Sequence, residues 1–217
     1  MRKIILFDLD GTLIESGEGI INSLHYAIEK MGLPEQTSED LRVLIGPPLL
    51  EQFMSYFDLT KEEAKKVVIF YHERYHPVGL YEGKPYQGIE HMLKELSEKG
   101  YILGVASSKP QHLVEEILQH VNYTHYFTLI VGSGEGDIRN TKRAVIKEAL
   151  REVSFDEKSD NVWMIGDKEH DVLGAREVGV LCVSVLYGYG TKEEIESVSP
   201  LVIVQTVEKL HQLLLTF

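Results

Sequence analysis

The sequence contains a single cysteine, Cys182, so no disulfide bond can form within the chain. Cys182 lies in the apolar run 180–186, where we expect a buried structural thiol. This cysteine usage fits a reducing compartment, and we expect the protein to be cytoplasmic. No segment approaches the roughly 20 consecutive apolar residues that a membrane-spanning helix requires, so we expect no membrane partner.

Basic residues are scarce relative to acidic ones. The chain has 22 Lys and Arg against 34 Asp and Glu, a formal net charge of −12, and no segment concentrates the positive charge. Because affinity for nucleic acid comes largely from lysines and arginines that neutralise phosphates, we expect no nucleic-acid partner. The other proportions, 43% hydrophobic and 26% charged among 217 residues, are those of a globular protein with one large domain or one domain with a modest insertion.

Six short apolar runs recur between turn residues. They do not alternate with polar residues, which is typical of strands buried on both faces of a parallel sheet. The expected strands are 3–7, 101–106, 127–131, 162–165, 180–186 and 201–204. Segments with helical periodicity lie at 89–99, 112–120, 141–153, 172–178 and 207–215. This order predicts an α/β fold, a doubly wound parallel sheet with a Rossmann-like core, in which ligands bind at the carboxyl ends of the strands.

One region breaks the alternation. From residue 17 to about residue 81 the sequence shows only helical patterns, and this length far exceeds an ordinary connection between strands. We therefore predict an inserted α-helical cap domain at 16–81 and a catalytic core formed by 1–15 and 82–217.

The strongest chemical signal is Asp8-Leu9-Asp10-Gly11-Thr12, directly after the first expected strand. Two carboxylates this close at a strand end cannot both be buried and charged without a cation or a shared proton. The alternative is a surface turn, because Asp-Gly is common in turns. A second acidic pair, Asp167 and Asp171, follows the strand 162–165, where a helix N-terminus would also favour acidic residues.

Three further segments are weaker signals. Ser107 and Ser108 follow the strand 101–106 and could face a ligand, although a serine before Pro110 could equally cap the next helix. The glycine-rich segment 132–136 lacks the spacing of a Walker loop and is interpreted as a connection. It leads to Lys142, which alone would be interpreted as a surface lysine.

Taken together, the order and spacing of these motifs resemble the haloacid dehalogenase-like hydrolases, in particular the phosphoglycolate phosphatase-like group with a helical cap. The resemblance spans nearly the whole chain and includes Gly46-Pro47-Pro48-Leu49 in the expected cap. It implies a phosphatase that hydrolyses small phosphate monoesters, such as phosphoglycolate, a nucleotide or a sugar phosphate, through an aspartyl-phosphate. We expect a small phosphorylated metabolite as the partner and a monomer or weak homodimer.

The resemblance also implies a role for each motif residue. Asp8 would be the nucleophile, Asp10 the acid and base, and Lys142 the cation beside the phosphate. The implied Mg²⁺ ligands and their supporting groups are Asp8, Asp10 through its backbone carbonyl, Asp167 and Asp171. The substrate-binding residues would be Thr12, Ser107, Ser108 and Lys142 in the core, with Gly46 and Pro47 in the cap.

The sequence departs from the usual pattern around the lysine. Asn140-Thr141-Lys142-Arg143 stands where relatives have Lys-Pro, so Lys142 is chosen over Arg143 and Lys109 because it begins a helix after a strand-end loop. Tyr187-Gly188-Tyr189-Gly190 ends another strand, and could either border the site or form a turn with packed aromatics. The remaining histidines show no metal-ligand pattern in the sequence.

Other functions fit less well. A phosphomutase of the same fold would keep every core residue, although Thr12, where mutase relatives often have Val, favours hydrolysis. A dehalogenase would not need Asp10. A phospho-acceptor signalling module also uses strand-end aspartates and Mg²⁺, but the inserted region and the Asp-x-Asp spacing argue against it. A binding protein without activity would not need all the motifs.

Overall fold

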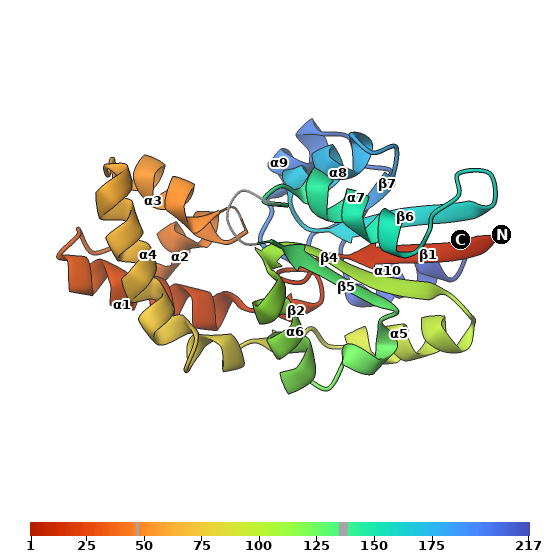
Figure 1. Cartoon of the computed structure of the whole chain (residues 1–217), viewed down its shortest axis with the longest axis horizontal. Coiled ribbons are helices and arrows are strands. Elements are labelled where there is room, and N and C mark those ends of the chain that lie inside the picture. The colour runs from red at the N-terminus through yellow and green to blue at the C-terminus, as the bar shows by residue number, and fades with distance from the viewer. Residues whose placement is uncertain (47, 135–138) are drawn as a thin grey trace. The chain divides into compact units, whose positions relative to one another are not determined.

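The computed structural model describes residues 1–46, 48–134 and 139–217 (Figure 1). The chain forms two compact units. The α/β unit comprises Met1–Ile14 and Pro85–Phe217, and the helical unit comprises Glu15–Lys84. At the two passages between the units, β2 (Ile14–Glu15) and β3 (Lys84–Pro85) pair as a two-stranded sheet.

A parallel six-stranded sheet forms the centre of the α/β unit, in the order β5-β4-β1-β6-β7-β8. Its strands are β1 (Arg2–Phe7), β4 (Ile102–Pro110), β5 (Leu129–Ser133), β6 (Asp160–Gly166), β7 (Leu181–Val185) and β8 (Val202–Val204). All six correspond to the expected strands, and the α/β class is confirmed. β1 lies in the middle, where the strand order reverses, and this is where open α/β sheets bind ligands.

Helices cover both faces of this sheet (Figure 1). They are α5 (Ile89–Glu98), α6 (Gln111–His120), η3 (Thr124–Tyr126), α7 (Lys142–Glu152), α8 (Glu169–Arg176), α9 (Lys192–Ser197) and α10 (Val207–Leu214). α7 and α8 lie on one face, and α5, α6 and α10 lie on the other. α9 was not expected from the sequence, because its six residues include a single apolar side chain, Ile195.

The core follows from the alternation of side chains along each buried strand. Ile4 and Leu6 of β1 lie in one cluster with Val145 and Ile146 of α7. The intervening Ile5 and Phe7 point to the opposite face and are also fully buried. This two-sided burial explains why the strands read as continuous apolar runs in the sequence.

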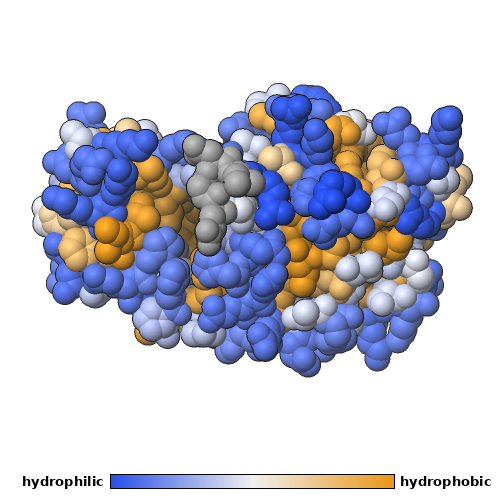
Figure 2. Space-filling model, viewed as in Figure 1, coloured by the Kyte–Doolittle hydropathy of each residue, from blue (hydrophilic) through white to orange (hydrophobic). Residues whose placement is uncertain are grey.

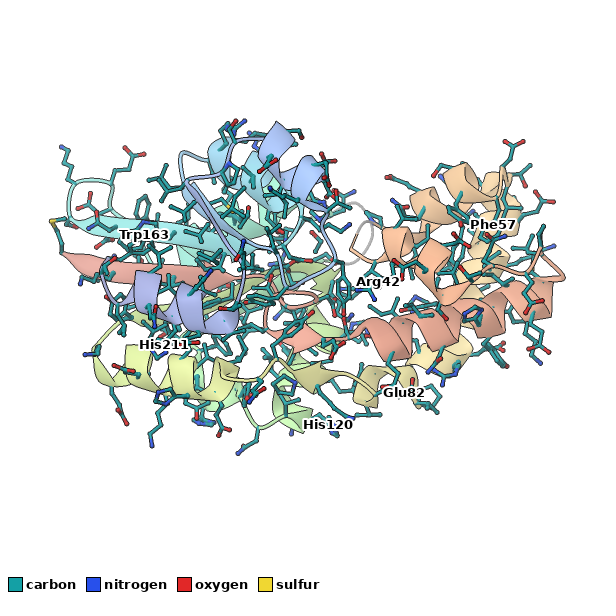
Figure 3. The ribbon with its side chains drawn as sticks, turned by 180° about the vertical axis from the view of Figure 1, so that it is seen from behind. Arg42, Phe57, Glu82, His120, Trp163 and His211 are labelled. Carbon is teal, nitrogen blue, oxygen red and sulfur yellow. The ribbon has the colours of Figure 1, made fainter. Side chains whose placement is uncertain are left out.

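Two single side chains show how the sheet is packed. Cys182 is buried in the same cluster as a free thiol, as the sequence predicts. The aromatic Trp163 stacks on Phe217, with ring centroids 4.3 Å apart, so that the last residue of the chain packs on the sheet (Figure 3).

The helical unit is built around α1 (Gly17–Met31) and α4 (Lys61–Tyr75), which pack against each other. Its other elements are α2 (Ser38–Leu41), η1 (Arg42–Leu44), α3 (Leu49–Tyr56) and η2 (Gly79–Tyr81). A capping box between Thr60 and Glu63 begins α4. The guanidinium of Arg74 donates two hydrogen bonds, of 2.9 and 2.8 Å, to the carboxylate of Glu82 and ties the end of α4 to the segment that follows η2.

On the face shown in Figure 2, polar and charged residues predominate, with smaller hydrophobic areas between them. Across the described residues, no helix combines the length and the apolar character needed to cross a membrane.

Leu6 and Leu181 form a matched pair for testing the sheet core. Leu6 is 0% exposed in the centre of β1, whereas Leu181 is 55% exposed at the start of β7. We expect Leu6→Ala to lower the free energy of unfolding by about 2 to 5 kcal/mol, because the substitution leaves a cavity. Leu181→Ala should change it by about 0.5 kcal/mol or less. Urea denaturation of the two variants measures the difference, and equal losses would contradict this description of the core.

Candidate active site

The acidic motifs meet because the register of the central strands aligns their ends. Phe7, the last residue of β1, lies opposite Val105 of β4 and Ile165 of β6. The pairing continues one step further, since the backbone N–H of Asp8 donates to the carbonyl of Ile165 at 2.9 Å. Asp8 therefore lies beside the Gly166-Asp167 segment, although the two are far apart in the sequence.

Three carboxylates converge at this edge of the sheet. Each of Asp8, Asp167 and Asp171 offers one oxygen, and these atoms all lie within 4.8 Å of one another. All three residues are buried. The structure therefore brings together three of the expected metal-site residues, and their oxygens are the kind of donor that divalent cations such as Mg²⁺ prefer.

A single lysine lies among these carboxylates. The Nζ atom of Lys142 is 2.8 Å from Asp8 Oδ1 and 2.8 Å from Asp171 Oδ1, and it donates to the carbonyl of Ala106 at 3.1 Å. Local sequence explains its position: the hydroxyl of Thr141 accepts a hydrogen bond from the backbone N–H of Ala144, which begins α7 at Lys142. Lys142 is thus a buried cation in contact with two of the three carboxylates.

The pKa values of these groups respond to burial and to one another. Burial opposes the charge of Lys142, but Asp171 and Asp8 outweigh that effect and raise the pKa of Lys142. Burial alone would raise the pKa of Asp171, yet Lys142 holds that pKa below its ordinary value. The pKa values of Asp8 and Asp167 shift in the opposite direction to that of Asp171. Burial raises the pKa of both, and the nearby Asp171 raises it further.

Asp167 is held by groups from two other segments. Its Oδ2 accepts the backbone N–H of Tyr189 at 2.8 Å, and its Oδ1 accepts the hydroxyl of Thr12 at 3.3 Å. The hydroxyl of Tyr187 donates to the carbonyl of Thr12 at 3.0 Å. The segment 187–190, which the sequence left open between two interpretations, therefore borders the site. The hydroxyl of Thr12, a residue expected to bind substrate, donates its hydrogen bond to Asp167.

Asp10 is not one of the three carboxylates whose oxygens converge. Its Oδ2 lies 2.8 Å from the Nζ of Lys109, and both side chains are largely buried. The sequence considered Lys109 only as an alternative to Lys142, because no sequence pattern pairs residues from the ends of β1 and β4. The structure gives each lysine its own carboxylate partners.

Ser107 and Ser108 lie within β4, which continues to Pro110, so they are not in a loop after a strand as expected. The alternative role as a helix cap is also wrong, because α6 begins after Pro110 without a side-chain cap. Ser107 is buried, and its Oγ accepts the backbone N–H of Lys109 at 3.4 Å. A hydroxyl at the end of a central strand is well placed to donate to a ligand at this edge.

The two expected cap residues belong to another part of the chain. Gly46 lies in the helical unit between η1 and α3, with φ of 115°, a conformation that favours glycine. Pro47 lies outside the described residues, as do residues 135–138 of the glycine-rich segment.

The charges present favour a bound cation. Three buried carboxylates carry −3 when ionised and Lys142 carries +1, which leaves −2 in a space shielded from water. A divalent ion would offset this charge, and all the converging donors are hard oxygens. The residues therefore fit a divalent metal ion.

Comparison with known proteins agrees with the site. The sequence profile of the haloacid dehalogenase-like hydrolases matches residues 5–185, and the chain belongs to this family. A 5′-nucleotidase from Pseudomonas aeruginosa is 38% identical over 90% of this chain and 88% of the relative. A phosphoglycolate phosphatase from Aquifex aeolicus is 31% identical over 86% of each chain.

A relative named for a different activity and a solved structure complete the comparison. Tyrosine-protein kinase PtkA from Mycobacterium tuberculosis is 30% identical over 98% of this chain and 72% of the relative. The crystal structure of a predicted phosphatase from Clostridium acetobutylicum has a TM-score of 0.92 and 36% identity, and the match covers 100% of both chains. The expected family and the expected enzyme class, a phosphoric monoester hydrolase, are confirmed.

Lys142 and Arg143 are neighbours on α7, and only one of them is buried, since the side chain of Arg143 is 58% exposed. We expect Lys142→Met to lower the free energy of unfolding by about 3 kcal/mol or more, because it leaves buried carboxylates without their cation. Arg143→Met should cost about 0.5 kcal/mol or less. Denaturation of the metal-free variants tests this. Should Arg143→Met cost as much as Lys142→Met, the choice of lysine would be wrong.

Proposed function

We propose that this protein is a Mg²⁺-dependent phosphatase that hydrolyses small phosphate monoesters through a phosphorylated Asp8. The observation that carries the proposal is the convergence of Asp8, Asp167 and Asp171 within 4.8 Å, with Lys142 paired to two of them. Phosphoryl transfer needs in-line positioning and neutralisation of charge more than any special functional group. This arrangement supplies a nucleophile and cationic charge at one point.

Asp8 and Asp167 would hold Mg²⁺ through their carboxylates, Asp10 would contribute its backbone carbonyl, and Asp171 would orient the other groups. When bound, the ion would neutralise charge on the phosphate oxygens. Lys142 would add a second positive charge beside Asp8, where it opposes the effect of burial on the pKa of Asp8, and it holds the pKa of Asp171 below its ordinary value.

The proposed reaction has two steps on the side chains of the chain itself. A carboxylate oxygen of Asp8 attacks phosphorus, the bond from phosphorus to the ester oxygen breaks, and the departing oxygen takes a proton from Asp10. Water then attacks the phosphorus of the aspartyl-phosphate, gives a proton to Asp10, and releases phosphate and the Asp8 carboxylate. Asp10 is available for this role because its carboxylate is not one of the three that converge at the expected metal position.

Nucleoside 5′-monophosphates are the first substrates to test. The support is the 38% identity to a protein named 5′-nucleotidase, compared with 31% to one named phosphoglycolate phosphatase. Phosphoglycolate and sugar phosphates complete the panel, and a bisphosphorylated sugar distinguishes a hydrolase from a phosphomutase, since only a hydrolase releases phosphate steadily.

Removal of divalent metal should abolish the activity. We expect phosphate release from at least one member of the panel with Mg²⁺ and a loss of at least about a hundredfold with a chelator, because the buried carboxylates would then repel the phosphate dianion. Re-addition of Mg²⁺ to the same sample is the control. Equal rates with and without chelator would refute metal dependence, and no release from any monoester would refute the proposed function.

Asp8 and Asp10 have the same functional group, but we expect different losses. Asp8→Asn should abolish the covalent phosphoenzyme. Asp10→Asn should still form it from acetyl phosphate, whose leaving group needs little protonation, while losing at least about a hundredfold of its rate on alkyl esters. Rapid-quench labelling of both variants is the measurement. Wild-type labelling in the Asp8 variant would exclude Asp8 as the nucleophile.

A further inference from the structure

A second group of potential metal ligands lies on different elements from the acidic motifs. His91 and Glu95 lie one turn apart on α5, and His211 lies on α10. One atom from each, a ring nitrogen or a carboxylate oxygen, lies within 4.8 Å of the other two. No sequence pattern marks this group, because α5 and α10 are more than 100 residues apart and only the fold brings them together.

The donor atoms of this group lie close to one another. Oε2 of Glu95 is 3.1 Å from Nε2 of His211 and 3.9 Å from Nε2 of His91. Despite the short separation, Nε2 of His211 is buried and makes no hydrogen bond with any described residue. A histidine that simply paired with a glutamate would satisfy that nitrogen, whereas a metal ion bound between the two would satisfy both.

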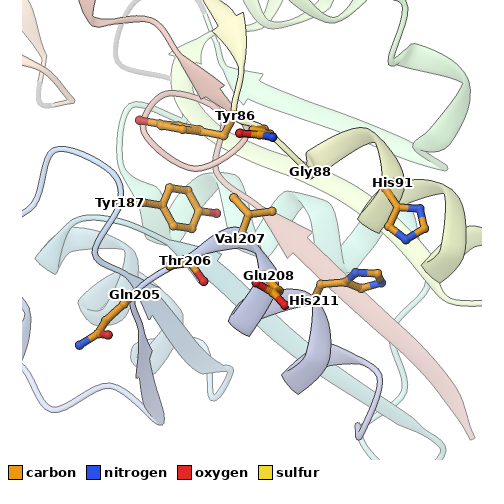
Figure 4. Close-up of a pocket in the computed structure, with 10 residues that line it drawn as sticks. Tyr86, Gly88, His91, Tyr187, Gln205, Thr206, Val207, Glu208 and His211 are labelled. Carbon is orange, nitrogen blue, oxygen red and sulfur yellow. The ribbon is translucent and has the colours of Figure 1, made fainter.

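The surroundings leave room for the ion and for a further ligand. The two imidazole rings are nearly perpendicular, with centroids 5.3 Å apart, and they line one end of a cavity of about 570 Å³ (Figure 4). Glu208, one turn before His211 on α10, lines the same cavity. The other oxygen of Glu95, Oε1, lies 3.7 Å from the ammonium of Lys99, so Oε2 remains available.

We propose that His91, Glu95 and His211 bind a transition-metal ion of the Zn²⁺ type, with an open coordination position that faces the cavity. Imidazole nitrogens favour Zn²⁺, Cu²⁺ or Ni²⁺ over Mg²⁺, and two histidines with one carboxylate form a recognised zinc ligand set. The proposal does not depend on the phosphatase chemistry. Bound metal would join α10, the last helix, to α5 and stabilise the α/β unit in proportion to its affinity.

The alternative is an ordinary pair between a histidine and a glutamate on the surface, with His91 nearby by chance. One observation favours that alternative, namely that the side chain of His91 is 75% exposed. The same exposure makes it a good test position, since replacing an exposed side chain should leave the fold intact. If His211 and Glu95 form only an ordinary pair, they would bind no metal, and replacing His91 would have no effect on metal binding.

Calorimetric titration of Zn²⁺ into the protein in excess Mg²⁺ tests the proposal. We expect one equivalent of Zn²⁺ to bind to the wild type, and His91→Gln and His211→Gln each to weaken it by at least about tenfold. His120→Gln, which removes a histidine from α6 instead, is the matched control (Figure 3) and should bind like the wild type. Asp167→Asn should also retain the equivalent, which separates this site from the three-carboxylate cluster.

Two further measurements make the outcome decisive. Melting of the variants in chelator shows whether they fold, and Zn²⁺ should raise the melting temperature of the wild type but not of His91→Gln. Co²⁺ in place of Zn²⁺ should give a visible absorption band that both histidine variants lose. The proposal is overturned by an absence of Zn²⁺ binding, by His91 and His211 variants that bind Zn²⁺ as tightly as the wild type, or by loss of the equivalent in Asp167→Asn alone.

Discussion

The burial of three carboxylates beside one another is the constraint on which the rest of the α/β unit depends. If nothing offset their charge, the ionised carboxylates of Asp8, Asp167 and Asp171 would repel one another and lower the stability of the folded state. Lys142 offsets one charge, and it can do so because α7 begins at that residue and packs against β4, where the carbonyl of Ala106 accepts a hydrogen bond from its ammonium. The negative charge that Lys142 does not offset is available to a bound cation. The buried carboxylates that lower the stability of the free protein therefore also create affinity for a divalent cation.

The backbone around these carboxylates is packed too closely to allow side chains. A Cβ at Gly166 would lie 2.2 Å from Cγ of Asp171, and a Cβ at Gly11 would lie 2.2 Å from Oδ2 of Asp167, at a φ of 79° that itself favours glycine. A larger residue at Gly11 or Gly166 would therefore collide with a carboxylate of the site, which explains why glycine stands at both positions. These glycines allow two chain segments to approach so closely that the carboxylates have only one arrangement, and a site that relies on positioning benefits from that restriction.

The sequence predicted the features that local patterns determine. Unalternating apolar runs located all six strands of the sheet, because a strand buried on both faces has no polar side, and strand-end aspartates marked the edge where ligands bind. Helix α9 was missed because one apolar residue makes no periodic pattern. The pairs between Asp10 and Lys109 and between His211 and Glu95 could not be predicted, because each joins residues whose proximity is decided by the order of strands and the packing of helices.

The two groups of ligands differ in donor type, so each would favour a different metal ion. The three-carboxylate cluster offers only hard oxygen donors and lies at the carboxyl ends of the central strands, which suits Mg²⁺. The group on α5 and α10 offers two imidazoles, which Mg²⁺ binds poorly and Zn²⁺ binds well. Tyr187 lines the cavity beside the second group and donates its hydroxyl to the carbonyl of Thr12, whose own hydroxyl is bonded to Asp167. Tyr187 therefore belongs both to the lining of the cavity and to the hydrogen-bonded chain that holds Asp167.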